Sequence, residues 1–153
     1  MVANLLFFLQ GILEMTGVVA FSLALARVPL LWGRIIVAGM SLCSVIYIVR
    51  SLQTKFGLHT VVLLLLLVFI VNKTTSTTYV KCYMVAFLSL ITLTLLEFII
   101  FKLYFLLTKS DPNEVISNVI IWKSLGLIQG VLLIIFAGLI SKYNIPNKDA
   151  WKI

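Results

Sequence analysis

Long runs of apolar residues alternate along this chain with short polar stretches. Five apolar segments, at about residues 3–26, 32–49, 58–71, 79–107 and 119–140, are separated by turns and loops that carry Pro, Gly, Asn, Thr or charged residues. A helix that crosses the hydrocarbon core of a bilayer needs about 20 mainly apolar residues. The pattern therefore predicts an all-α fold, a polytopic integral membrane protein built as a bundle of about five transmembrane helices.

The third and fourth segments depart from the ideal length in opposite directions. The third contains the run LLLLLVFIV but is short. It either crosses the bilayer, with Lys55 and Lys73 extending to the two interfaces, or lies as a shallow segment where the bilayer is thin. The fourth is longer than a bilayer requires, so we expect it to tilt or to extend beyond the hydrocarbon core. We assign residues 1–141 to the helical bundle and residues 142–153 to a short polar cytoplasmic tail.

Composition supports a membrane location. Hydrophobic residues make up 62% of the chain and charged residues 11%, whereas soluble domains have about 45–50% and about 25%. The first apolar run has no Lys or Arg before Arg27 and is too long for the apolar region of a signal peptide. We expect it to be retained as a span of a multi-pass cell-membrane protein.

The basic residues occur singly, and this distribution argues against nucleic-acid binding despite a net charge of +7. Basic residues that flank spans set orientation, with the excess on the cytoplasmic side. With the N-terminus outside, seven basic residues are cytoplasmic, namely Arg27, Arg34, Lys73, Lys81, Lys142, Lys148 and Lys152. Five are then external, namely Arg50, Lys55, Lys102, Lys109 and Lys123. The count favours an external N-terminus and a cytoplasmic C-terminus.

Two carboxylates lie inside predicted spans, Glu14 in the first and Glu97 in the fourth. Charged groups in hydrocarbon are costly and are candidates for functional sites. Gln10 shares a helix face with Glu14, and Gln129 lies in the fifth span. These four side chains either line a cavity that binds a cation, a proton or a cationic ligand group, or form neutral hydrogen bonds that hold the bundle together. In either case we expect Glu14 to face the bundle interior.

Other motifs carry little chemistry. The pair Gly126 and Gly130, four residues apart in a Gly-x-x-x-Gly motif, permits close helix approach, either within the bundle or in a dimer. Cys43, Cys82 and His59 show neither metal-ligand nor catalytic spacing. We therefore expect no enzyme activity, no metal and no cofactor, and the pattern leaves the oligomeric state open.

Several stretches resemble a known membrane region. They are ILEMTGVVAFSLALARVPLLWGRIIVAG, IYIVRSL, FGLHT and LLEFIIFKLYFLLT. Together they look like the multi-span region found in small Gram-positive membrane proteins and ahead of the ATP-binding domains of quorum-sensing-type histidine kinases. The likeness covers about residues 5–140 and is most specific around Glu14, around Arg27 and Pro29, and around His59. It implies a helical bundle with a cytoplasmic C-terminus.

Two functions follow as hypotheses. The given sequence ends at Ile153 with neither a phosphoacceptor histidine nor an ATP-binding lobe. The first hypothesis is therefore a non-enzymatic sensor or regulatory module for signal transduction, acting on a separate cytoplasmic signalling protein. The alternative is a small transporter, or a transporter membrane subunit, that uses Glu14 or Glu97 as its coupling carboxylate.

Overall fold

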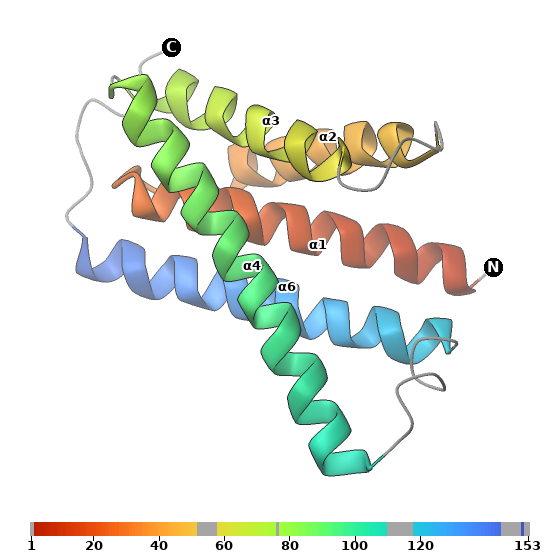
Figure 1. Cartoon of the computed structure of the whole chain (residues 1–153). Coiled ribbons are helices and arrows are strands. Elements are labelled where there is room, and N and C mark those ends of the chain that lie inside the picture. Colours follow the sequence, from red (N-terminus) through yellow and green to blue (C-terminus); the bar gives the residue numbers. More distant parts are fainter. Residues whose placement is uncertain (1, 52–57, 76, 110–117, 145–150, 152–153) are drawn as a thin grey trace.

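The computed structural model describes residues 2–51, 58–75, 77–109, 118–144 and 151 (Figure 1). Regular structure in these residues is helical throughout, as five helices: α1 Val2–Leu25, α2 Trp32–Ser51, α3 Leu58–Thr74, α4 Tyr79–Thr108 and α6 Val119–Tyr143. The predicted all-α fold is confirmed, and each helix begins and ends within three residues of its predicted segment. Lys55, Lys148 and Lys152 of the predicted charge balance lie outside the described residues, as does the side chain of Arg50.

Four helices, α1, α2, α4 and α6, are long and apolar enough to cross a membrane. The exception is α3, whose 17 residues extend about 25 Å at 1.5 Å per residue. That is slightly less than the hydrocarbon core of about 30 Å. The fold thus fits a multi-pass membrane protein, and α3 is the short apolar helix that its sequence predicted.

Successive helices run in alternating directions (Figure 1). Close contacts fix the register of α1 against its two main neighbours. Gly11 of α1 lies against Cys43 of α2, and Gly39 of α2 lies against Thr16, which is an antiparallel pairing. Gly130 of α6 lies against Glu14, and Leu133 lies against Gly17, which is a parallel pairing. The first and last helices therefore start at the same end of the bundle.

The longest helix, α4, crosses the others obliquely (Figure 1). Its first half packs against α3 and α1, where the hydroxyl of Ser22 donates to the hydroxyl of Ser89 at 2.8 Å. Its middle meets α6. Past Leu96, the ring of Phe101 packs against Trp122 of α6, with ring centres 4.5 Å apart. The C-terminal end of α4 leads away from the other helices (Figure 1) and exposes large apolar side chains, including Leu106 and Leu107.

The core surrounds the second half of α1, where all residues from Met15 to Ala24 are buried. Val18, Val19 and Leu23 are fully buried, and they meet Leu67 of α3 and Leu133 of α6 in one cluster. Large apolar side chains elsewhere are exposed, including many on α4. In a bilayer such surface costs nothing, since lipid tails are as apolar as leucine. The helices are consequently held by close packing and a few hydrogen bonds.

The end of the bundle where α1 stops is joined to the C-terminal region. Arg27 adopts a left-handed conformation with φ 58° and ends α1. Trp151 lies against this end, where its ring is half-buried. The predicted polar tail thus contributes an indole to the bundle, while residues 145–150, 152 and 153 of that tail lie outside the described residues.

Candidate functional site

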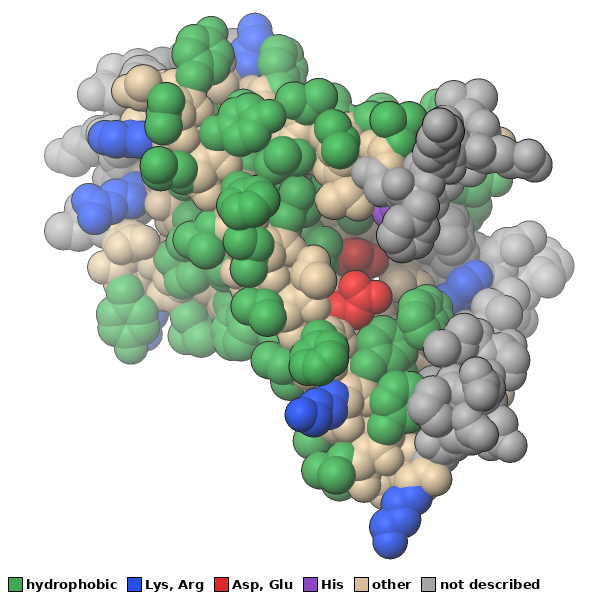
Figure 2. Space-filling view, in the orientation of Figure 1, with side chains coloured by type: hydrophobic (Ala, Val, Ile, Leu, Met, Phe, Trp, Pro, Cys, Tyr) green, Lys and Arg blue, Asp and Glu red, His purple; other side chains and the backbone are tan. Residues whose placement is uncertain are grey.

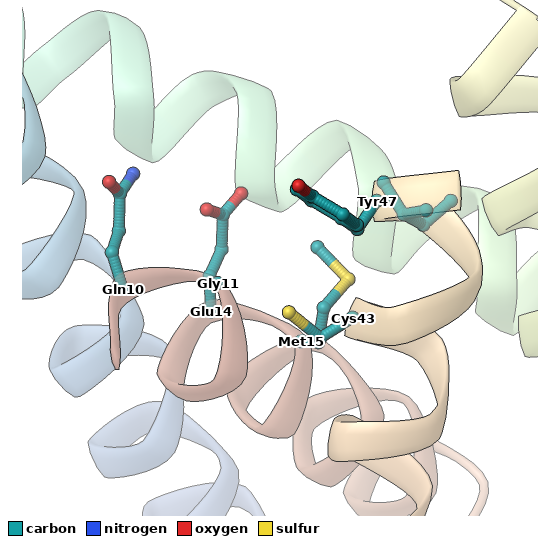
Figure 3. A pocket seen from close by; sticks show the side chains of 7 residues that line it. Gln10, Gly11, Glu14, Met15, Cys43 and Tyr47 are labelled. Carbon is teal, nitrogen blue, oxygen red and sulfur yellow. The ribbon is translucent and has the colours of Figure 1, made fainter. Parts of the chain in front are cut away.

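Glu14 lies at the edge of a cavity of about 70 Å³ between α1 and α2 (Figure 3). The cavity is lined by Gln10, Gly11, Glu14 and Met15 of α1 and by Cys43, Ile46 and Tyr47 of α2. Glu14 itself is half-buried. The site joins a carboxylate, a carboxamide, a phenol and two sulfur atoms in an otherwise apolar region.

Helical spacing explains how α1 builds its side of the cavity. Gln10 and Glu14 are four residues apart and therefore lie on one face, one turn above the other. In Figure 3 both side chains point in the same direction, toward α4. Gly11 lies between them and carries no side chain; a Cβ there would come within 2.8 Å of the Cys43 sulfur. The glycine lets α2 approach closely enough for its residues to face Glu14.

The contribution of α2 comes from Cys43 and Tyr47, which are also four residues apart. In Figure 3 the phenol of Tyr47 points from α2 toward Glu14. The Tyr47 ring also packs against Phe8, with ring centres 5.4 Å apart. Sequence reasoning missed both α2 residues. Their shared face and the polar tip of Tyr47 in an apolar helix were the available signals.

Glycines also bring α6 close to α1. A Cβ on Gly130 would come within 3.0 Å of the Glu14 backbone nitrogen and 3.1 Å of the Leu13 carbonyl carbon. A Cβ on Gly126 would overlap the side-chain amide of Gln10. The Gly126 and Gly130 face therefore packs within this chain, against the Gln10 side chain and the Glu14 backbone of α1. This contact fixes the position of the Glu14 backbone.

The other predicted polar residues occupy different places. Gln129 is buried, and its side-chain nitrogen donates to the carbonyl oxygen of Leu93 at 3.0 Å, so it joins α6 to α4. Glu97 lies on an exposed part of α4. Glu14 and Glu97 are the acidic residues within the described part of the chain, and Figure 2 shows two acidic side chains in one hollow of the molecular surface. The structure brings Gln10 and Glu14 together and leaves Gln129 out of their cavity.

A buried hydroxyl lies near the site. Thr16 Oγ1 has no hydrogen-bond partner within the described residues. It faces Gly39 of α2, where a Cβ would come within 2.8 Å of the Thr16 backbone. The two helices therefore meet at backbone distance one turn beyond the cavity, and this contact limits how far α2 can move there.

The chemistry of the cavity suits a small cation or a cationic group. Glu14 supplies a carboxylate, Gln10 a carbonyl oxygen, and Tyr47 a phenol oxygen. No group of three or more His, Cys, Asp or Glu side chains that could hold a metal ion is found among the described residues. No family model, curated protein or solved structure matches the chain.

Proposed function

We propose that this protein is a non-enzymatic membrane module that binds a small cation, or the cationic group of a ligand, at Glu14. A separate cytoplasmic protein binds the module in a way that depends on the resulting change in helix packing. One observation carries this proposal: the Glu14 side chain lines a cavity toward α2, while its backbone is held against Gly130 of α6. The likeness to kinase membrane regions around Glu14 points in the same direction.

The cavity is large enough for a ligand of this kind. A single ordered water needs about 10–15 Å³ of such space, and the cavity offers about 70 Å³. A cation beside a half-buried carboxylate is attracted more strongly than in bulk water, because the surrounding protein screens the two charges less. Binding draws Gln10, Glu14 and Tyr47 toward one centre.

The packing around α1 lets ligand binding in the cavity affect the structure at the end of the bundle. A ligand in the cavity lies between Glu14 of α1 and Tyr47 of α2 and acts on how these helices pack, and the contact of Gly39 with Thr16 couples them one turn nearer the start of α2. The start of α2 and the α1–α2 turn are the places that Trp151 contacts, through Arg34 and Pro29. A shift of α2 would therefore reach the C-terminal region, which supports a sensor over a transporter.

The proposed orientation places this end in the cytoplasm. The structure gathers Arg27, Arg34, Lys73, Lys81 and Lys142 at the ends of helices on that side of the bundle, and Figure 2 shows Lys and Arg side chains there, at the left. Basic residues concentrate on the cytoplasmic side of membrane proteins. The N-terminus is then external and the C-terminus cytoplasmic.

Cation binding can be tested with three probes: sodium, potassium and tetramethylammonium chlorides at equal ionic strength. The melting midpoint of the protein in mild detergent is measured for wild type, Glu14→Gln and the control Gln129→Leu, which removes a buried polar residue outside the cavity lining. We expect one cation to raise the midpoints of wild type and Gln129→Leu, and to leave the midpoint of Glu14→Gln unchanged. A ligand at 100 times its Kd stabilises by about 2.7 kcal/mol. Equal midpoints for wild type and Glu14→Gln in all three salts would contradict the proposal.

The transporter alternative rests on the two acidic side chains that share one hollow in Figure 2. It predicts that vesicles containing the protein move the stabilising cation or protons, and that both Glu14→Gln and Glu97→Gln abolish the flux. The sensor proposal predicts no flux. It also predicts cation-dependent retention of a cytoplasmic protein when the module is purified from native membranes.

A further inference from the structure

A second, larger cavity lies at the basic end of the bundle. It has a volume of about 510 Å³ and opens between the end of α1, the end of α3 and the start of α4. Two of its lining residues are cationic, Arg27 and Lys81, and Thr77 adds a hydroxyl. Its inner wall is apolar and includes Leu25, Val71 and Met84. This cavity shares no residue with the Glu14 cavity.

Backbone hydrogen bonds fix the position of Arg27. The amide of Val28 donates to the carbonyl oxygen of Leu23 at 2.9 Å, and the amide of Arg27 donates to that of Ala24 at 3.1 Å. With φ 58°, Arg27 takes the left-handed conformation that commonly ends a helix. The guanidinium is therefore attached to a rigid helix end rather than to a free loop.

Lys81 approaches the same cavity from another helix. It lies in the first turn of α4, and its amide donates to the carbonyl oxygen of Thr78 at 2.9 Å. Thr78 makes no side-chain hydrogen bond to this turn, so an anion there would meet the positive end of the helix dipole as well as the ammonium group. Neither Lys81 nor Arg27 forms an ion pair with an acidic side chain of the described residues, because Glu14 and Glu97 both lie in mid-helix.

We propose that this cavity binds the phosphate headgroup of an anionic phospholipid between Arg27 and Lys81, with an acyl chain along Leu25, Val71 and Met84. Basic pockets between transmembrane helices hold anionic headgroups in this way. The helix ends place the two cations where headgroups lie, and the apolar wall continues toward the membrane interior. A soluble phosphate would satisfy the cations and leave the apolar wall uncovered.

The test measures lipid binding to the purified full chain by native mass spectrometry and by the shift in melting midpoint. The probes are dioleoyl phosphatidylglycerol, dioleoyl phosphatidylcholine and inorganic phosphate. The variant is Arg27→Gln with Lys81→Gln. Its matched control is Lys73→Gln with Lys142→Gln, which removes the same charge at the same end from residues that do not line the cavity.

We expect wild type and the control pair to bind phosphatidylglycerol in preference to phosphatidylcholine, and the Arg27 and Lys81 pair to lose this preference. One basic residue near an anionic surface is worth about 1 kcal/mol, so each lost cation should weaken binding roughly fivefold. Equal losses in both double variants would show general surface attraction and overturn the site. Inorganic phosphate raising the midpoint as much as phosphatidylglycerol would overturn the assignment to a lipid. Neither result would bear on cation binding at Glu14.

Discussion

The indole N–H of Trp151 donates a hydrogen bond of 2.8 Å to the carbonyl oxygen of Pro29, in the turn between α1 and α2. The backbone N–H of Trp151 also donates to the carbonyl oxygen of Thr74, at the end of α3, at 3.1 Å. The guanidinium of Arg34, at the start of α2, lies 5.2 Å from the centre of the Trp151 ring. A single residue near the C-terminus therefore ties together three helix ends at the basic side of the bundle.

Replacing this indole should weaken that end of the fold. Trp151→Ala removes a hydrogen bond worth about 0.5–1.5 kcal/mol and a cation–π contact worth about 0.5–1 kcal/mol. We expect a stability loss of about 1–2.5 kcal/mol by these two contributions, seen as a lower melting midpoint in detergent. Trp32→Ala, at an exposed position of α2, serves as the control. If Trp151→Ala has the same melting midpoint as wild type, the hydrogen bond and the cation–π contact of Trp151 contribute nothing to stability.

Alanine substitutions at the glycines of the helix contacts should differ sharply in how much they destabilise the fold. At Gly39 and Gly130 the new Cβ would meet backbone atoms at 2.8 Å and 3.0 Å, which cannot move aside. Overpacking of this kind costs about 1–3 kcal/mol, so both variants should lower the melting midpoint. Gly126→Ala should cost less, because it meets the flexible Gln10 side chain.

Gly138 supplies the matched control on α6, since its new Cβ would meet no atom within 4 Å. Gly138→Ala should therefore leave the midpoint unchanged or raise it. Equal effects at Gly130 and Gly138 would contradict the packing explanation. Loss of an oligomer without a change in midpoint would instead assign the Gly130 face to dimerisation.

The link between α6 and α4 predicts a smaller effect. Gln129→Leu keeps the side chain bulky and removes the hydrogen bond to Leu93. Interhelical bonds in membranes average about 0.6 kcal/mol and reach about 1.7 kcal/mol, so we expect a loss within that range. Ser124→Ala removes a bond within α6 itself and should be neutral. Equal midpoints for the two variants would show that α4 is held by its other contacts.

The orientation and the crossing by α3 can be tested together. A fluorescent reporter fused after Ile153 should be active in the cytoplasm, and an alkaline phosphatase fused there should be inactive. Labels placed at residues 52–57 and at Thr77 should be accessible from opposite sides of the membrane. Labels accessible from one side would show that α3 does not cross, and an active phosphatase would reverse the orientation.

The helices could be predicted from the sequence because their limits are local properties. The predicted 32–49 segment became α2 Trp32–Ser51, and the predicted 79–107 segment became α4 Tyr79–Thr108, since apolar run length and the polar loops fix both ends. The sequence does not determine in the same way which helix faces pack against one another. In a bilayer, an apolar side chain is equally suited to lipid and to another helix.

Half of the candidate site was therefore beyond sequence reasoning. The pairing of Gln10 with Glu14 follows from helical spacing alone. The approach of Cys43 and Tyr47 depends on how α2 is rotated, which the close contacts at Gly11 and Gly39 determine. Trp151 was hidden for a similar reason, because a polar tail gives no signal that one of its residues docks on distant helix ends.

Two substitutions of Glu14 separate a structural from a functional carboxylate. Glu14→Gln keeps the length and most of the hydrogen-bonding capacity of the side chain, so the fold and the α1–α6 contact at Gly130 should be unchanged. Glu14→Ala empties one wall of the cavity and removes a polar partner, at a cost of about 1–2 kcal/mol, as for interhelical hydrogen bonds in model peptides. Melting midpoints in detergent measure this difference.

Whether the Glu14 carboxylate binds a cation is then decided by the behaviour of Glu14→Gln. If Glu14 binds a cation, the glutamine variant should fold with a wild-type midpoint in buffer without the stabilising cation and lose the added stability when that cation is present. Tyr47→Phe removes the phenol that points toward Glu14 and keeps the ring against Phe8, so it should weaken binding less than Glu14→Gln does. A glutamine variant that retains the full cation response would show that the negative charge is not used, and would leave Glu14 as a packing residue between α1 and α2.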